Sequence, residues 1–90
     1  MYNINMIFKY KVIVKLRDGV KDAKGEAVSN VLKHIDSYSY SPDVHVGKYF
    51  EFNVEANDEN IAGSKAINII EDVFINPILE TYNIVGVEKL

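Results

Sequence analysis

The sequence has 90 residues and contains no cysteine, which excludes two classes of small protein. A chain without cysteine can form neither a disulfide framework nor a thiolate zinc site. At this length there is room for one small domain, so an enzyme with an active site between two domains is also excluded. We therefore expect stability to come from packing or from a partner subunit.

Long apolar runs are missing too, although 48% of the residues are hydrophobic. No run approaches the roughly 18 residues that a membrane span needs. Residues 1–5 have neither the basic region nor the apolar region of a signal peptide. These absences predict a protein of the cytoplasm with no membrane partner.

The sequence has few basic residues: it contains 10 basic and 13 acidic residues, and its net charge is −3. Non-specific binding to nucleic acid needs a broad positive field. We therefore predict no nucleic-acid partner.

Residues suited to catalysis or metal binding are few and badly spaced. His34 and His45 are the only histidines, and neither has an acidic partner at a metal-ligand spacing. No Gly-x-Ser-x-Gly elbow is present, and Gly19 and Gly25 do not have the spacing of a phosphate loop. The residues therefore predict no catalytic, cofactor or metal site.

The first half of the chain predicts a strand followed by a helix. Apolar and basic residues alternate over 8–17, as in a half-buried strand, and Asp18 and Gly19 form a turn. Asp22 can cap a helix over 23–36, in which apolar residues recur at helical spacing. A serine- and tyrosine-rich loop over 37–42 follows.

Residues 43–56 again alternate, with Gly47 inside the pattern. The segment is either one strand bent at Gly47 or two strands at an angle, and we favour one bent strand. Phe50 and Phe52 share the phase of the core valines, which leaves Tyr49 and Glu51 on the outward face.

The last third predicts a second helix, a short turn and a final strand. Asn57 and Asp58 can cap a helix whose wide apolar stripe reaches residue 74, and we expect this stripe to be well buried. Asn76 should cap a short helical turn that begins at Pro77. The final strand covers about 82–88.

This order of elements predicts an α+β fold, a two-layer sandwich with two helices on one face of a mostly antiparallel sheet and a ferredoxin-like shape. One domain covers residues 8–90 after an N-terminal extension over 1–7. The second face of the sheet has no covering helix and is a natural docking place for another subunit.

Three segments together resemble one family, the small PurS subunit of phosphoribosylformylglycinamidine (FGAM) synthase. They are GVKDAKG over 19–25, VGKYFE over 46–51 and NPILETY over 76–82. The resemblance extends from about residue 8 to residue 90. Because the segments keep the family's order and spacing in a short chain, the match is specific.

The sequence departs from the usual family pattern at two places. Asp18 replaces a proline before Gly-Val, and Ala23 and Lys24 replace the Pro-Gln of the helix start. The cap and glycine of this motif are kept, so the turn geometry should persist. Family chains also begin close to the first strand, which makes Met6 an alternative start.

The resemblance implies a non-catalytic homodimer, or a tetramer built from it, that holds the glutaminase PurQ against the synthetase PurL for ammonia transfer in purine biosynthesis. It implies no cofactor for this chain, since PurL binds ATP, magnesium and the substrate. The alternative is a stand-alone dimeric small-ligand or regulatory domain of ferredoxin-like shape. A third hypothesis is a small independent enzyme.

The candidate interface residues come from the three motifs. They are Gly19, Val20, Asp22, Gly25, Gly47, Lys48, Tyr49, Asn76, Pro77, Glu80 and Tyr82. Glu80 and Tyr82 have two interpretations: either they contact a partner or fix the last strand for that contact, or they are a solvated charge and an ordinary half-buried strand residue. The pattern does not decide whether the last strand is exchanged between subunits, or which surfaces meet PurL and PurQ.

Overall fold

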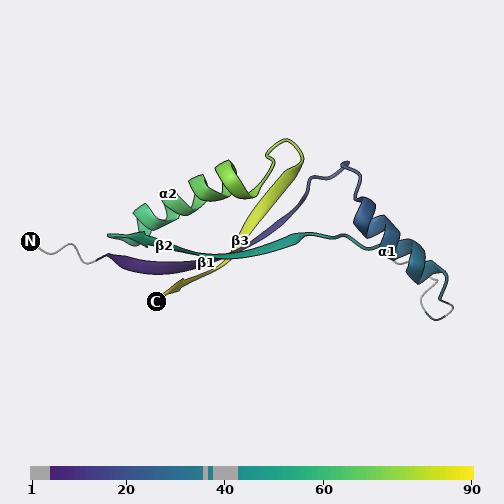
Figure 1. The fold of residues 1–90 in the computed structure, drawn as a ribbon, viewed down its shortest axis with the longest axis horizontal. Coiled ribbons are helices and arrows are strands. Elements are labelled where there is room, and N and C mark those ends of the chain that lie inside the picture. The colour runs from purple at the N-terminus through teal and green to yellow at the C-terminus, as the bar shows by residue number, and fades with distance from the viewer. Residues whose placement is uncertain (1–4, 36, 38–42) are drawn as a thin grey trace, which may run out of the picture.

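The computed structural model describes residues 5–35, 37 and 43–90 (Figure 1). The elements are β1 (Met6–Leu16), α1 (Ala23–Lys33), β2 (Lys48–Ala56), α2 (Glu59–Ile69), the π-helical turn η2 (Ile70–Phe74) and β3 (Glu80–Lys89). The strands form one antiparallel sheet in the order β2-β1-β3. The predicted α+β class and order of elements are confirmed. Residues 1–4 of the expected extension lie outside the described residues, and β1 already begins at Met6.

The core lies between α2 and the inner face of the sheet. The alternating pattern of β1 buries four side chains on that face: Phe8, Tyr10, Val12 and Val14. Ala62, Ala66 and Ile70 are the fully buried residues of α2 and η2. Because two of these three are alanines, the helix can lie close to the strands.

Aromatic rings extend the core along β2. Phe50 stacks on Phe74, with ring centroids 4.5 Å apart, and Phe52 meets the same ring edge-on at 5.0 Å. Both geometries are favourable for aromatic pairs. The predicted inward direction of Phe50 and Phe52 is therefore confirmed.

The expectation of a well-buried stripe on α2 is wrong. Ile61, Ile67 and Val73 are 44%, 41% and 72% exposed. One narrow side of the helix meets the sheet, and among the described residues no second layer covers its other sides. The helix also widens at its end, where the amide of Ile75 donates to the carbonyl of Ile70 over 3.1 Å.

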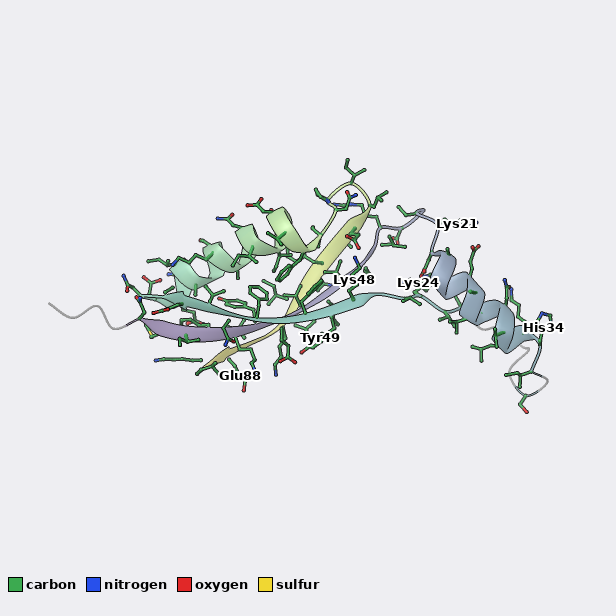
Figure 2. The ribbon with its side chains drawn as sticks, viewed as in Figure 1. Lys21, Lys24, His34, Lys48, Tyr49 and Glu88 are labelled. Carbon is green, nitrogen blue, oxygen red and sulfur yellow. The ribbon has the colours of Figure 1, made fainter. Side chains whose placement is uncertain are left out.

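The outer face of the sheet carries paired charges. Lys9 lies 3.6 Å from Glu51 and Lys11 lies 3.4 Å from Glu88, so opposite charges meet between neighbouring strands. Figure 2 shows Tyr49 and Glu88 on the side of the sheet away from α2. Tyr49 is 52% exposed, which confirms its outward direction.

Helix α1 does not lie over the sheet with α2. It stands beyond the end of the strands (Figure 1), and it packs against no described strand or other helix. The molecule measures 67 × 27 × 14 Å, with a radius of gyration of 18.1 Å. A compact chain of this length would have a radius of gyration near 12 Å. Among the helices that the structure describes, α2 is the one that covers the sheet.

Helix α1 ends at Lys33, three residues earlier than predicted. The amides of His34 and Ile35 donate to the carbonyls of Val31 and Leu32, which tightens the last turn. The predicted loop over 37–42 lies outside the described residues except for Ser37.

The prediction of one bent strand over 43–56 is wrong, because β2 begins at Lys48. Gly47 precedes the strand, and among the described glycines Gly19 alone has a positive φ. A Cβ added to Gly47 would lie 2.7 Å from the carbonyl oxygen of Val14. This glycine therefore permits close approach to β1 and is not required for an unusual backbone angle.

We expect Gly47→Ala to lower the free energy of unfolding by about 1 to 3 kcal/mol, because the added methyl group must push backbone aside. Denaturant unfolding measures the change. Gly86→Ala is the matched control, since its Cβ would meet the flexible Lys11 side chain at 3.2 Å and not backbone. Equal stability of the Gly47→Ala variant and the unmodified chain would contradict this role.

Candidate functional site

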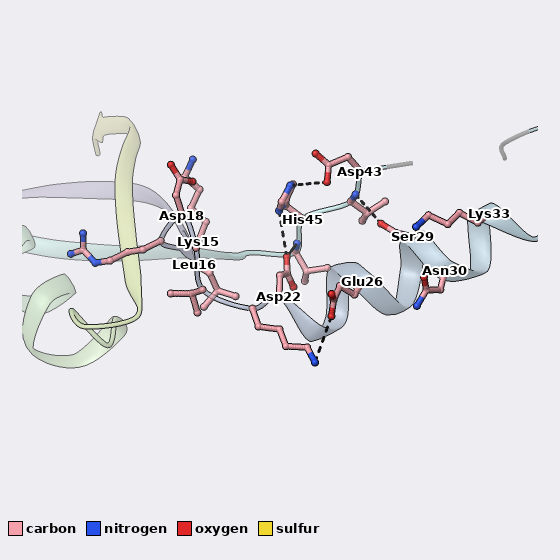
Figure 3. Close-up of a pocket in the computed structure, with 16 residues that line it drawn as sticks. Lys15, Leu16, Asp18, Asp22, Glu26, Ser29, Asn30, Lys33, Asp43 and His45 are labelled. Atoms are coloured by element: carbon pink, nitrogen blue, oxygen red, sulfur yellow. Dashed lines mark hydrogen bonds and ion pairs between the residues drawn. The ribbon is translucent and has the colours of Figure 1, made fainter. Parts of the chain in front are cut away.

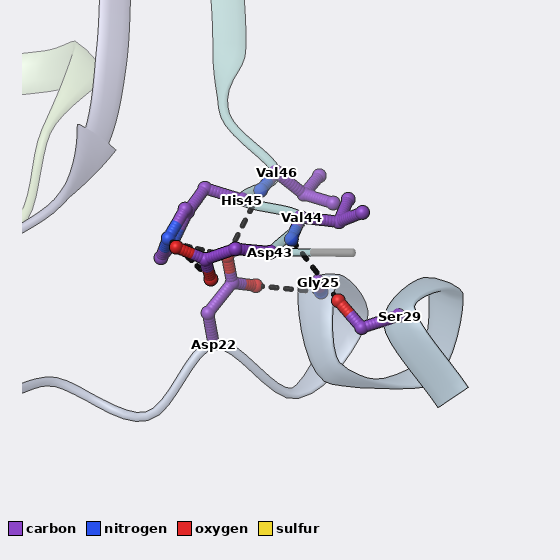
Figure 4. Close-up of polar contacts among 7 residues, drawn as sticks. All are labelled: Asp22, Gly25, Ser29, Asp43, Val44, His45 and Val46. Carbon is purple, nitrogen blue, oxygen red and sulfur yellow. Dashed lines mark hydrogen bonds and ion pairs between the residues drawn. The ribbon is translucent and has the colours of Figure 1, made fainter. Parts of the chain in front are cut away.

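The candidate residues gather mainly at two junctions, each built on one carboxylate. The first, the Asp22 junction, consists of Asp22, Gly25, Ser29 and the segment 43–46 (Figure 4). Asp22 Oδ1 accepts from the amide of Gly25 at 2.8 Å, and Asp22 Oδ2 accepts from the amide of Val46 at 2.9 Å. One carboxylate therefore caps α1 and also fixes the segment that returns from it.

Helix α1 lies directly against this returning segment. The amide of Val44 donates to Ser29 Oγ at 3.0 Å, and both Gly25 and Ser29 are buried. A Cβ added to Gly25 would collide with the carbonyl oxygen of Val44. Gly25 thus allows the backbones of α1 and the returning segment to touch.

The electrostatics of this junction favour an ionised Asp22. The amides of Gly25 and Val46 lower its pKa, and His45 Nδ1, 3.8 Å from Oδ2, acts in the same direction. His45 Nε2 also lies 3.1 Å from Asp43 Oδ1, but the His45 side chain is 74% exposed. In the described ranges, no three His, Asp or Glu residues are grouped to hold a metal ion.

The turn before α1 needs its glycine. Gly19 has φ +85°, a left-handed conformation that glycine adopts without strain. The amide of Val20 donates to the carbonyl of Arg17 at 3.1 Å, which closes the turn. The predicted turn at Gly19 is confirmed.

An open hollow lies between this turn, α1 and the segment 43–46 (Figure 3). Its charged lining residues are of both signs: Lys15, Arg17, Lys21, Lys33, Asp18, Asp22, Glu26 and Asp43. Such a lining does not present the uniformly positive surface that holds a phosphate group.

The second group, the Glu80 junction, consists of Glu80, Asn76, Lys48 and Arg17. Glu80 is 9% exposed, and its Oε1 accepts from the amide of Asn76 at 2.8 Å. Its Oε2 lies 3.3 Å from Lys48 Nζ. The Asn76 amide, with a smaller contribution from Lys48, lowers the pKa of Glu80. The interpretation of Glu80 as a solvated charge that the turn does not need is therefore wrong.

Residues 76–80 form one hydrogen-bonded turn and not a helix. Asn76 Oδ1 accepts from the amide of Ile78 at 3.0 Å, which confirms the predicted cap. Arg17, which sequence reasoning missed, donates from Nε to the carbonyl of Pro77 at 3.1 Å and from its amide to Leu79. The turn is thus fastened to the ends of both β1 and β2.

The two candidate tyrosines lie on opposite faces of the sheet. Tyr82 is half-buried opposite Val14, and its hydroxyl donates to Glu71 at 3.1 Å. Burial and the neighbouring Glu71 raise the pKa of Tyr82. This placement fits a strand residue that belongs to the fold. Tyr49 is exposed beside Glu51 and is free of the core. The structure does not bring either tyrosine to the two junctions.

Two apolar residues that sequence reasoning missed stand at the tip of the Glu80 junction. Ile78 is 81% exposed and Leu79 is 43% exposed. The signal in the sequence is an apolar pair directly after Asn-Pro, where turns usually carry polar residues. A fixed turn that presents apolar side chains to solvent is typical of a contact surface for another protein.

The two lowered pKa values predict a loss of stability in acid. The ordinary pKa values are 3.8 for Asp22 and 4.5 for Glu80, and both are lower in the fold. A carboxylate with a lowered pKa contributes stability above its unfolded-state value, and that contribution is lost as pH falls through the folded-state value. We expect unfolding titrations to show stability falling below about pH 5. The decline should be shallower in Glu80→Gln, and an identical slope would contradict the assignment.

The comparisons with known proteins agree on one family. The family model described as PurS, phosphoribosylformylglycinamidine (FGAM) synthase, matches residues 9–88. The PurS subunit of Bacillus subtilis is 33% identical over 76 residues, which are 84% of this chain and 88% of that protein.

Solved structures show the same fold. The crystal structure of the PurS subunit of Thermotoga maritima has a TM-score of 0.77 at 26% identity, over 97% of this chain and 95% of that one. A chain of the PurLQS structure from Thermotoga maritima has a TM-score of 0.74 at 27% identity, over 93% of this chain and 98% of that one. The chain therefore belongs to the PurS family of phosphoribosylformylglycinamidine synthase.

Proposed function

We propose that this chain is the non-catalytic bridging subunit of a glutamine-dependent FGAM synthase in purine biosynthesis. It holds a PurQ glutaminase against a PurL synthetase, so that ammonia passes between them. The name of the PurLQS structure, one chain of which shares this fold, supports an assembly of this composition. The chain contributes no catalytic, cofactor or metal-binding residue to the reaction.

The observation that carries the proposal is the apolar tip of the Glu80 junction. A bridging subunit needs fixed surfaces that can bury apolar area against another protein. Ile78 and Leu79 supply such a surface, and the backbone beneath them is fixed by Arg17, Asn76 and Glu80. The elongated shape leaves further surfaces, including the outer sheet face with Tyr49, for a second partner.

The alternative, a stand-alone small-ligand or regulatory domain, needs an enclosed apolar pocket with a few polar groups. The hollow beside the Asp22 junction is open and lined by charges of both signs. The geometry favours the bridging role over this alternative.

Two further sequence predictions belong to this proposal. Residues 8–90 act as one domain, and the protein works in the cytoplasm with its partner enzymes. In the part of the chain that the structure describes, no helix is long and apolar enough to cross a membrane.

Assembly of the complex tests the proposal. PurL and PurQ from the same organism are mixed with and without this chain, and light scattering reports the mass of the product. We expect a complex of all three proteins, and we expect Ile78→Asp to weaken its formation at least tenfold. Val73→Asp, at a position that is 72% exposed, is the matched control and should assemble normally. Stable association of PurL with PurQ without this chain, or full assembly with Ile78→Asp, would refute the proposal.

A further inference from the structure

Two exposed basic residues border the apolar tip of the Glu80 junction on the side of the strands. The amide of Arg17 donates to the carbonyl of Leu79 at 2.9 Å, and its Nε donates to the carbonyl of Pro77 at 3.1 Å. Lys15 pairs with β3 just beyond the turn. Figure 1 shows the turn that leads into β3 standing out from the rest of the molecule. The tip therefore presents its apolar residues beside two positive charges.

The guanidinium of Arg17 is held in place but keeps donors for another contact. Its Nε is bound to the turn, while its terminal nitrogens make no hydrogen bond or ion pair with any residue that the structure describes. A guanidinium presents its N–H groups as a rigid fork that matches the two oxygens of a carboxylate. Because the turn already holds the side chain, less conformational entropy remains to be lost when a carboxylate binds. Arg17 thus offers a prepared contact for a carboxylate.

Neighbouring charges on the sheet are compensated within the chain. Lys9 and Lys11 each pair with a carboxylate of a neighbouring strand. Glu80, the carboxylate of the turn itself, is buried and already paired. Among the described residues, Lys15 and Arg17 have no such ion pair. In a chain with a net charge of −3, this end of the sheet is therefore locally positive.

The carboxylates of the hollow beside Arg17 do not neutralise it either. Asp22, Glu26 and Asp43 each contact a basic side chain or a backbone amide of their own. Asp18 follows Arg17 in the chain but forms no ion pair with it in the part of the chain that the structure describes. The two cations at the tip are therefore available to a partner.

We propose that the tip binds a surface of one partner enzyme in which an apolar pocket receives Ile78 and carboxylates beside the pocket face Arg17 and Lys15. The inference rests on the proposed function and names the chemistry of the partner at that site. The helical side of the turn carries Glu71 and Asp72, so the partner's carboxylates lie opposite the strand side alone. Arginine is among the residues that most often carry binding energy in protein interfaces, and complementary charges at the edge speed association.

Two substitutions at one position separate charge from apolar contact. Ile78→Lys and Ile78→Glu remove the same apolar side chain and introduce side chains of similar length and opposite charge. Surface plasmon resonance measures binding of PurL and PurQ, alone and mixed, to the immobilised full-length chain. We expect both variants to bind more weakly than the unmodified chain. Ile78→Glu should bind at least about tenfold more weakly than Ile78→Lys, because its carboxylate repels those of the partner and competes for Arg17.

Arg17 also fixes the turn, so the second test changes the exposed Lys15. We expect Lys15→Glu to lower the association rate constant at least about fivefold at about 0.05 M salt and less than about twofold at about 0.5 M, because salt screens exposed charges. Lys89→Glu makes the same change of net charge at the far end of β3 and is the matched control. Its association rate should stay within about twofold of the unmodified chain. Circular dichroism verifies that the variants remain folded.

The outcomes separate this inference from the bridging role. Equal weakening by Ile78→Lys and Ile78→Glu, or an unchanged association rate of Lys15→Glu at low salt, would overturn the acidic surface and leave the bridging role intact. Loss of self-association by Lys15→Glu without the enzymes would assign the tip to a second copy and would also overturn the proposal. Failure of the unmodified chain to bind either enzyme would refute the bridging role, and this inference with it.

Discussion

Gly25→Ala is expected to release α1 from the rest of the molecule while the sheet stays folded. The added Cβ would collide with the carbonyl oxygen of Val44 and lie 2.6 Å from Asp22 Oδ2, so the helix start and the returning segment cannot both keep their positions. Because α1 packs on no other described element, local opening needs no change in the core. We expect the free energy of this local opening to fall by about 2 kcal/mol, which corresponds to roughly 30-fold faster exchange of the α1 amides.

Hydrogen exchange resolved by residue measures this effect. Amides of β1 and α2 should keep their protection. Gly63→Ala is the control, since its Cβ would have only the Tyr10 hydroxyl as a neighbour, at 3.9 Å, and alanine favours a helix. Unchanged protection of α1 in Gly25→Ala, or an equal loss over the whole chain, would show that the Asp22 junction does not hold the helix.

Glu80→Ala is expected to destabilise the whole fold. It removes a charge-assisted hydrogen bond from the Asn76 amide and the ion pair with Lys48 in one change. A hydrogen bond to a charged group contributes about 1.5 to 3 kcal/mol, whereas an exposed ion pair contributes at most about 1 kcal/mol. We therefore expect the free energy of unfolding to fall by about 2 kcal/mol and the melting temperature to fall by roughly 8 to 16 °C.

Two neighbouring variants separate the contributions. Glu80→Gln keeps an acceptor for the Asn76 amide and should cost less than Glu80→Ala. Lys48→Met removes the ion pair alone and should cost under about 1 kcal/mol. If Lys48→Met proved as damaging as Glu80→Ala, the ion pair and not the turn would be the main function of this carboxylate.

Much of the fold was predictable because local patterns decide it. Strict alternation in β1 predicted the four side chains on the inner face, Phe8, Tyr10, Val12 and Val14. Asp22 and Asp58 predicted the two helix starts, because their side chains cap free amides there. The family resemblance rested on segments of the same local kind, and the comparisons confirmed it.

Other features depend on contacts between distant segments, which no local pattern reports. The alternation over 43–56 does not depend on whether a partner strand lies beside each residue. Pairing with β1 begins only at Lys48, so the strand is shorter than the pattern. In the sequence, Glu80 has the features of a solvated charge. Its burial depends on Asn76 and Lys48, which only the fold places beside it. Helix α1 has the stripe of a packed helix, yet among the described residues no strand or other helix packs against it.

The most direct test of the bridging role compares two nitrogen sources. FGAM synthesis is measured with purified PurL, with PurL and PurQ, and with both enzymes and this chain, first with an ammonium salt and then with glutamine. The bridging role predicts that the rate of synthesis from ammonium is the same in all three mixtures, because PurL needs no other subunit to use it. Glutamine should support synthesis only when PurQ and this chain are both present. Equal glutamine-dependent rates with and without the chain would contradict it.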